Sequence, residues 1–165
     1  LHLTPSLLLQ RSYHMKKAEF ARIVGKSFVT LESKYNFKRV DASFHTGGVV
    51  VTYQNPTTEL CLNYEIGVYP WITIGDINNP EEDRISLDWL LVELGEREAP
   101  TTDETFFPLE MEEDQLEAEL QKKSKQLLKF GVDMLNGDFS MMPKLKARAA
   151  DYLAECRKIA DRYKV

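Results

Sequence analysis

Near Asn36 the spacing of apolar residues changes from the period of a helix to the period of a strand. Between Met15 and Asn36 the apolar residues recur at steps of three and four, which places them on one face of an amphipathic helix. After Arg39, apolar and polar residues alternate instead, as they do in a strand with one buried face. A helix that precedes such strands must bury its apolar face against their sheet, so the sequence predicts an α+β fold.

Four strand-like runs follow this helix. They span Arg39 to His45, Val49 to Gln54, Glu59 to Glu65, and Tyr69 to Ile74. Gly47-Gly48 and Asn55-Pro56-Thr57-Thr58 are expected to be turns. If Gln54 pairs with Glu59, the apolar residues Val49, Val51 and Tyr53 all meet apolar partners on one side of the hairpin. We therefore expect a four-stranded antiparallel sheet with one face covered by the N-terminal amphipathic helix.

The opposite face of this predicted sheet is amphipathic rather than fully polar. In one interpretation the C-terminal helices cover it as a second core layer. In the other it stays partly open and binds a protein partner, because aromatic and small polar side chains together are typical of interface cores. The sequence leaves this alternative open. The residues assigned to the face are Asp41, Ser43, His45, Val50, Thr52, Cys61, Asn63, Tyr69, Trp71 and Thr73.

The rest of the chain is expected to form a short helix, a linker and two longer helices. Ser86 is placed to cap a short helix that buries four leucines up to Leu94 and ends at Gly95. Residues 15–95 then hold the helix, the sheet and this short helix, and residues 96–109 are expected to be an acidic linker. The apolar pattern of residues 110–165 predicts a C-terminal helical hairpin that packs on the same domain, with Gly137 in its turn. Residues 1–14 are interpreted as a leader or a disordered arm.

Acidic residues are concentrated in the middle of the chain. The net charge is −5, yet residues 76–119 carry 16 acidic and 2 basic side chains, against 5 and 8 before them and 5 and 11 after them. In one interpretation this acidic block is a solvated segment that the basic flanks partly neutralise. In the other it is a surface that attracts a basic partner and repels nucleic-acid phosphates. Its candidate partner-binding residues are Glu81, Glu82, Asp83, Glu110, Glu112 and Glu113.

No catalytic, metal-binding or cofactor-binding motif stands out. Two cysteines, Cys61 and Cys156, are too few for a disulfide framework, and both are expected to be buried and reduced. The tripeptide Gly25-Lys26-Ser27 lies in the helical pattern and lacks the strand that precedes a nucleotide-binding loop. No apolar run is long enough to span a membrane, so we expect a cytoplasmic protein. Because no such motif stands out, we also expect no cofactor and no metal.

The pattern resembles that of small bacterial α+β proteins of unassigned function, among which immunity proteins of toxin–immunity systems are frequent. The resemblance rests on the stretches GGVVVTYQNPTTELCLNYE, WITIGDI and LLKFGVDMLNGDFS, which follow an amphipathic helix. It implies a cytoplasmic, non-catalytic protein that binds and blocks a toxin, often a basic nuclease, with acidic residues. Such proteins share no fixed binding motif, so the resemblance assigns no inhibitory residue.

The sequence therefore predicts a protein-binding module without enzymatic activity, with immunity against a basic toxin as the specific hypothesis. The first alternative is a small-ligand protein or enzyme that uses the sheet face around His45, Asp41 and Trp71. A further alternative is a regulator whose acidic block mimics nucleic acid. Direct nucleic-acid or membrane binding is not expected. The identity of the partner and the oligomeric state are left open.

Overall fold

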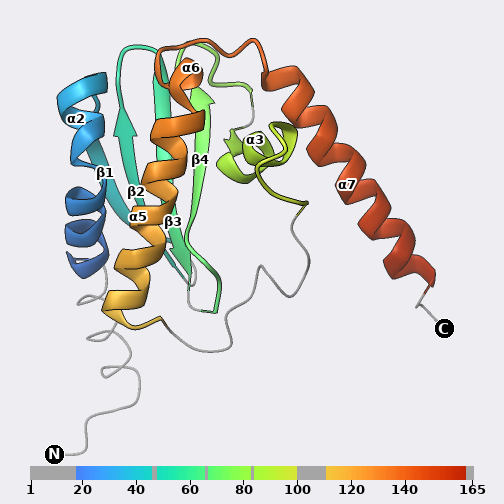
Figure 1. The fold of residues 1–165 in the computed structure, drawn as a ribbon, viewed down its shortest axis with the longest axis horizontal. Helices are drawn as coiled ribbons and strands as arrows, with labels where there is room; N and C mark the ends of the chain where they lie inside the picture. The colour runs from blue at the N-terminus through green and yellow to red at the C-terminus, as the bar shows by residue number, and fades with distance from the viewer. Residues whose placement is uncertain (1–17, 46–47, 66, 83, 100–110, 163–165) are drawn as a thin grey trace, which may run out of the picture.

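The structure, a computed structural model, is built on one five-stranded antiparallel sheet (Figure 1). It describes residues 18–45, 48–65, 67–82, 84–99 and 111–162. Each strand pairs with the next one along the chain, so the sheet is a simple meander. The strands are β1 (Lys38–His45), β2 (Gly48–Gln54), β3 (Thr58–Glu65), β4 (Trp71–Asp76) and β5 (Ile85–Ser86).

The predicted register of the central hairpin is confirmed. Gln54 pairs with Glu59, and the pairs Tyr53–Leu60, Val51–Leu62 and Val49–Tyr64 follow in step. All six residues of these three pairs are buried, whereas the residues between them on β2 are half-buried. The period-two pattern therefore identified which side of the hairpin faces the core.

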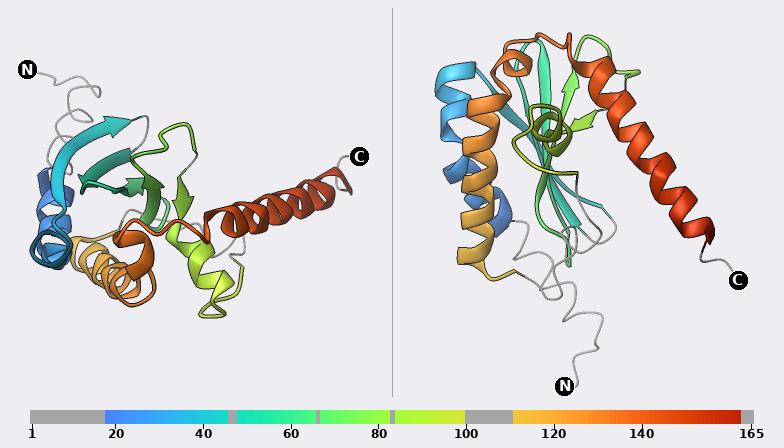
Figure 2. Two further views of the ribbon diagram at one scale, coloured as in Figure 1. Left: turned by 90° about the horizontal axis from the view of Figure 1, so that it is seen from above. Right: turned by 45° about the vertical axis from the view of Figure 1, so that its right-hand side comes forward.

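Helices cover one face of the sheet and leave the other without a described helix (Figure 2). The covering layer contains a helical stretch over residues 18–27, a turn at Phe28, and the helices α2, α3 and α5. Their apolar sides and the covered sheet face form one hydrophobic core. The helices after residue 27 are α2 (Val29–Tyr35), α3 (Leu87–Glu93), α5 (Glu113–Phe130), α6 (Val132–Leu135) and α7 (Met142–Arg162).

The alternation predicted for the first strand is wrong at Val40. The pairing of β1 with β2 shifts between Arg39 and Asp41, so the strand bulges there and Val40 is 52% exposed. Phe44 is also exposed, because β1 is the edge strand of the sheet. A bulge and a twisted edge are common devices that prevent another strand from pairing with the sheet.

The fourth strand begins later than expected, and a fifth strand was not predicted. β4 starts at Trp71, and Tyr69 instead packs against the hydrophobic core from the segment before it. β5 pairs with only two residues of β4, Thr73 and Ile74. Two residues are too short for any apolar period, so the sequence carries no signal for β5.

The C-terminal helices do not form the predicted hairpin. The helical pattern breaks at Gly131 into α5 and the short α6, and α3 lies between α5 and α7 (Figure 2). The first half of α7 packs on the body of the protein, where Tyr152 contacts Trp89 of α3 with ring centroids 5.2 Å apart. Its second half projects away, so Leu153 and Ile159 are exposed. Cys156 is exposed as well, which corrects its predicted burial.

The turn between α6 and α7 packs against the turn between β2 and β3. Gly137 has a φ of +88°, as expected for a helix C-terminus, and the backbone N–H of Ser140 donates to Asp138 Oδ1 over 2.9 Å. That hydrogen bond lowers the pKa of the Asp138 carboxyl. The Thr58 hydroxyl, which is fully buried, donates to the backbone carbonyl of Met134 over 2.7 Å. Two turns far apart in sequence thus form one junction.

The short helix α3 largely follows its prediction. The hydroxyl of Ser86 accepts a hydrogen bond from the backbone N–H of Asp88 over 3.3 Å and caps the helix, and Gly95 beyond its end has a φ of +73°. The prediction that Leu94 faces the core is wrong, because Leu94 lies past the last turn of α3 and is 44% exposed. Among the described helices, none is both long and apolar enough to cross a membrane.

Candidate functional site

The side of the sheet on which no described helix packs is here called the outer face, and its side chains alternate with those of the core. The register places Ser43, Val50, Asn63 and Trp71 in one row across β1 to β4. A second row runs from Asp41 through Thr52, Cys61 and Thr73 to Ser86 on β5. Most of these side chains are half-buried. The described C-terminal helices do not cover this face, which contradicts the interpretation that they form a second core layer there.

Cys61 lies at the centre of the outer face. Its side chain is 8% exposed, and its sulfur lies 3.8 Å from the hydroxyl of Thr52. Burial raises the pKa of the Cys61 thiol, an effect that hydrogen bonds with Thr52 and Thr73 partly oppose. Beside it, the Glu59 carboxylate pairs with Arg84 and accepts a 2.5 Å hydrogen bond from the Gln54 amide. This end of the face is therefore internally charge-balanced.

These cysteine environments predict selective labelling. In the folded protein at pH 8, iodoacetamide is expected to modify exposed Cys156 at least tenfold faster than Cys61, because the thiolate is the reactive form and burial both shields Cys61 and raises the pKa of its thiol. Peptide mapping by mass spectrometry after timed quenching measures both rates. In 6 M guanidinium chloride the two rates should become similar. Equal rates in the native protein would contradict the burial of Cys61.

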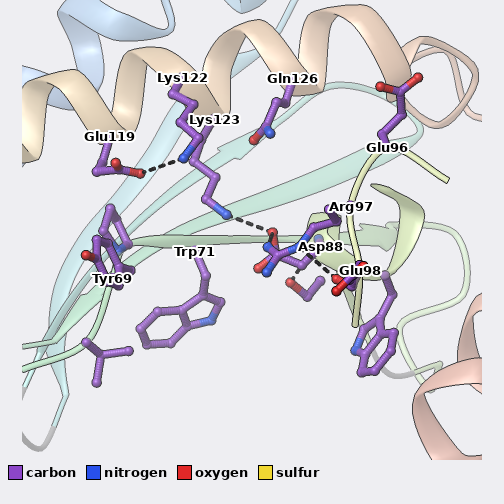
Figure 3. Close-up of a pocket in the computed structure, with 14 residues that line it drawn as sticks. Tyr69, Trp71, Asp88, Glu96, Arg97, Glu98, Glu119, Lys122, Lys123 and Gln126 are labelled. Atoms are coloured by element: carbon purple, nitrogen blue, oxygen red, sulfur yellow. Dashed lines mark hydrogen bonds and ion pairs between the residues drawn. The ribbon is translucent and has the colours of Figure 1, made fainter. Parts of the chain in front are cut away.

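A cavity of about 870 Å³ lies beside the first residues of β4, beyond the pairing of β4 with β5, between α3 and α5 (Figure 3). We call it the β4-edge cavity. Aromatic side chains of Tyr69, Trp71 and Trp89 contribute to its wall, and α5 contributes long polar side chains. Its volume is typical of sites that bind small molecules or short peptide segments. Its lining residues are Val68, Tyr69, Pro70, Trp71, Ser86, Asp88, Trp89, Glu96, Arg97, Glu98, Glu119, Lys122, Lys123 and Gln126.

The basic side chains in this cavity are paired with its own carboxylates. Lys123, which is buried, donates to Asp88 Oδ1 over 2.7 Å, and the Arg97 guanidinium lies 2.8 Å from the same oxygen. Lys122 lies 3.6 Å from Glu119 one turn earlier on α5. A buried lysine requires such a partner, so the Asp88 pair also holds α3 against α5.

The acidic block is partly neutralised by the basic flanks, as the first interpretation of the charge pattern expected. Glu113 pairs with Arg22, and hydrogen bonds with Glu19 and Arg22 lower the pKa of its carboxyl. Within the described residues, the other ion pairs that join the block to the flanks are Lys26–Glu117 at 2.6 Å, Lys122–Glu119 at 3.6 Å, Lys123–Asp88 at 2.7 Å, Lys144–Glu93 at 2.5 Å and Lys146–Glu82 at 3.5 Å.

The residues predicted to bind a partner are not gathered into one site. Asp41 and the backbone of His45 belong to β1, three strands from Trp71, which corresponds to about 14 Å at the usual strand spacing. Trp71 and Tyr69 meet at the β4-edge cavity, but Tyr69 is on its core side rather than on the outer face. Among the described residues, Asp41 and Trp71 are therefore not brought together in a single pocket.

The predicted acidic residues lie away from the outer face. Glu81 and Glu82 are exposed in the connection between β4 and β5. Glu112 is the N-cap of α5 in a capping box with Gln115, and Glu113 follows it in the first turn. Asp83 and Glu110 lie outside the described residues, as do the predicted leader 1–14 and most of the predicted linker. Of these positions, Glu112 and Glu113 have structural roles in starting and anchoring α5.

Sequence reasoning missed Asp88, Arg97 and Lys123, which form the ion-pair network of the cavity. They come from α3, the turn after it and α5, and their separation in sequence gave no motif. The Ser86 cap and the short helix did predict where Asp88 would lie along the chain. Within the described ranges there is no group of three or more His, Cys, Asp or Glu side chains that could hold a metal ion.

Comparison of the chain with protein-family models, with curated proteins and with solved structures finds no match.

Proposed function

We propose that this protein is a non-catalytic module that binds another protein through the outer face of its sheet, and that the partner is a basic toxin which it neutralises. The observation that carries the proposal is the exposure of an amphipathic sheet face: the described helices that pack on the sheet lie on its other side. Its central rows combine Val50, Cys61 and Trp71 with small polar residues.

The chemistry of the outer face supports a protein partner. Half-buried apolar and aromatic side chains surrounded by hydroxyl and amide groups resemble the centre and rim of a protein interface. Thr52, Asn63 and Thr73 supply hydrogen-bonding groups that adapt to another protein surface. Asp41, which is exposed at the β1 side, adds a negative charge at the rim.

The charge distribution supports a basic partner. Several carboxylates of the acidic block are paired internally, but Glu81 and Glu112 are exposed, and the net charge of the whole chain is −5. A net negative protein attracts a basic partner over a distance of about one Debye length, roughly 10 Å at 0.1 M salt. The internal ion pairs count against mimicry of nucleic acid, since such mimicry needs a continuous surface of unpaired carboxylates.

The substitution Thr52→Lys tests this proposal. Thr52 is half-buried in the middle of the outer face, so a lysine there adds bulk and positive charge against a basic partner without entering the core. We expect at least tenfold weaker binding to the toxin encoded beside its gene, measured by titration calorimetry, and loss of growth protection on co-expression. Ser33→Lys on the exposed side of α2 is the matched control and should retain both.

The same experiment defines what would contradict the proposal. Full protection by the Thr52→Lys variant would exclude the outer face as the binding surface. Binding that is unchanged between 0.1 M and 0.5 M NaCl would show that electrostatic attraction does not contribute to the affinity, because salt screens attraction between exposed charges. Absence of a toxic product among the neighbouring genes would leave a binding module without the immunity role.

A further inference from the structure

We infer that the β4-edge cavity binds an arginine or lysine side chain carried on an extended segment of the partner protein. This inference rests on the proposed function, because it names the part of a basic partner that the protein recognises. It concerns a second surface, at the edge of the sheet rather than on its outer face. Three properties of the cavity carry it: its aromatic wall, its unpaired acceptors and the open edge of β4.

The aromatic wall suits a cation. Trp71 and Tyr69 lie on the strand side of the cavity, as Figure 3 shows, and Trp89 lies on the side of α3. The π-faces of such rings attract ammonium and guanidinium groups, and a guanidinium also stacks flat on an indole. An edge-to-face contact with Tyr152 of α7 holds the Trp89 ring in place.

The charge balance of the cavity favours the same ligand. Its cations Lys122, Lys123 and Arg97 are already held in ion pairs with carboxylates of the cavity. Glu96 and Glu98 are exposed beside them and have no ion-pair partner among the residues that the structure describes. A cationic side chain that enters the cavity is therefore attracted by these two carboxylates, which lie at the end of the cavity away from Tyr69 and Trp71 (Figure 3).

A buried acceptor points in the same direction. Gln126 Oε1 lies on the α5 side of the cavity and is buried without a hydrogen-bond partner in the described chain. Because this oxygen is shielded from solvent, the Gln126 side chain must turn toward the cavity before a ligand N–H group can donate to it, and that hydrogen bond would remove the cost of the unpaired acceptor. Ammonium and guanidinium groups, and the backbone N–H groups of a peptide, can all donate such a hydrogen bond.

The first residues of β4, which have no described partner strand on the side of β5, explain why the ligand is an extended segment. β5 pairs with β4 only at Thr73 and Ile74, so Trp71 and Ile72 have no partner strand on that side within residues 67–82 and 84–99. Because successive residues of a strand direct their N–H and C=O groups to opposite edges, one of these two residues presents its backbone to the cavity side. Because α3 begins at Leu87 directly after β5, an extended segment would reach this backbone from the cavity side, past the first turn of α3, and hydrogen-bond there.

The test uses a capped peptide, acetyl-Gly-Ser-Thr-Arg-Thr-Ser-Gly-amide, titrated into the full-length protein and followed by tryptophan fluorescence and by NMR shifts of backbone amides. We expect saturable binding with the largest shifts at Tyr69, Trp71 and Ile72. The peptide with citrulline in place of arginine keeps the shape but loses the charge, and it should bind at least fivefold more weakly. Equal affinity for the two peptides would overturn the inference.

Matched variants separate the cavity from the rest of the surface. The double variant Glu96→Gln/Glu98→Gln is expected to weaken binding of the arginine peptide at least fivefold, whereas Glu32→Gln/Glu155→Gln removes the same charge from exposed sites outside the cavity and should leave the affinity unchanged. Arginine amide alone should bind at least tenfold more weakly than the peptide. If it binds equally well, the role of the β4 edge is wrong and the cavity is a small-ligand site.

Failure of this inference is distinguishable from failure of the proposed function. The Thr52→Lys variant, two strands away on β2, should keep its affinity for the arginine peptide even though it loses the toxin. Toxin binding that persists while the peptide fails to bind overturns the cavity inference alone. Peptide binding with no protection against any neighbouring toxin overturns the immunity function alone.

Discussion

Replacing Asn55 by alanine is expected to lower the free energy of unfolding by about 3 kcal/mol, since the side chain makes several hydrogen bonds that each contribute about 1 kcal/mol. Its amide nitrogen donates to the backbone carbonyls of Tyr35, over 3.2 Å, and Leu135, over 3.0 Å. Its oxygen accepts from the backbone N–H groups of Thr57 and Thr58 over 3.0 and 2.8 Å. One side chain thus joins the end of α2, the β2–β3 turn and the end of α6.

Urea denaturation followed by circular dichroism measures this loss, and two further variants separate its causes. Asn55→Asp keeps an acceptor for Thr57 and Thr58 but cannot donate to the two carbonyls, so we expect a loss of about 2 kcal/mol. Asn78→Ala, at an exposed position of the β4–β5 connection, should change stability by less than about 0.5 kcal/mol. An Asn55→Ala protein as stable as the parent would show that water replaces these hydrogen bonds at no cost.

Replacing Gly137 by alanine is expected to destabilise the protein by about 3 kcal/mol, for two independent reasons. The first is its φ of +88°, a region that costs an L-residue about 1–2 kcal/mol. The second is space, because an added Cβ would lie 2.8 Å from both Cβ and Oγ1 of Thr57. Relieving that overlap requires the two turns of the junction to separate, which also strains the hydrogen bond between Thr58 and Met134.

Gly95 provides the matched control for this prediction. It also has a positive φ, +73°, but nothing lies within 4 Å of the position where a Cβ would be added. Gly95→Ala should therefore cost only the backbone contribution, about 1 kcal/mol. The difference between the two variants measures the contact with Thr57, and a double-mutant cycle with Thr57→Gly should recover most of it. Equal losses at both glycines would contradict the steric part of the account.

The fold was predictable from the sequence where a period repeats over several residues. The alternation from Val49 to Glu65 determined the hairpin register residue by residue, since a slip of one position would have exposed Val51 and Leu62. The helical period likewise located the N-terminal helix and α7. The bulge at Val40 and the two-residue strand β5 were not predictable, because each depends on pairing with a neighbouring strand rather than on its own residues.

The prediction of a C-terminal helical hairpin failed for a different physical reason. The apolar stripe of α7 shows that one side of the helix can be buried, but it does not identify the element that buries it. Leu145 is fully buried and Tyr152 contacts Trp89, whereas Leu153 and Ile159 on the same helix are exposed. Periodicity predicts an amphipathic helix equally well in both halves, and the packing of α3 between α5 and α7 decides which half is covered.

The candidate site was predictable in part. Trp71 was singled out as an aromatic residue on a mostly polar face, and the structure places it in the outer face and at the β4-edge cavity. The network of Asp88, Arg97 and Lys123 could not be found, because its three residues carry no motif and meet through the packing of α3 on α5. The charge count correctly indicated two basic flanks around an acidic block, but not which carboxylates they neutralise.

The junction between the two turns also has a consequence for the order of folding. The strands pair between neighbours in sequence, and residues 54 and 59 already meet across the β2–β3 turn, whereas the hydrogen bonds of Asn55 and Thr58 to α6 close loops of 80 and 76 residues. Closing a long loop costs more chain entropy than closing a short one, so the hairpins form early and this junction forms late. Contacts absent from the transition state govern the unfolding rate, so substitution at Gly137 should mainly shorten the lifetime of the native state and leave the refolding rate almost unchanged. Substitution at Asn55 also removes two hydrogen bonds within the early β2–β3 turn, so it should slow refolding as well.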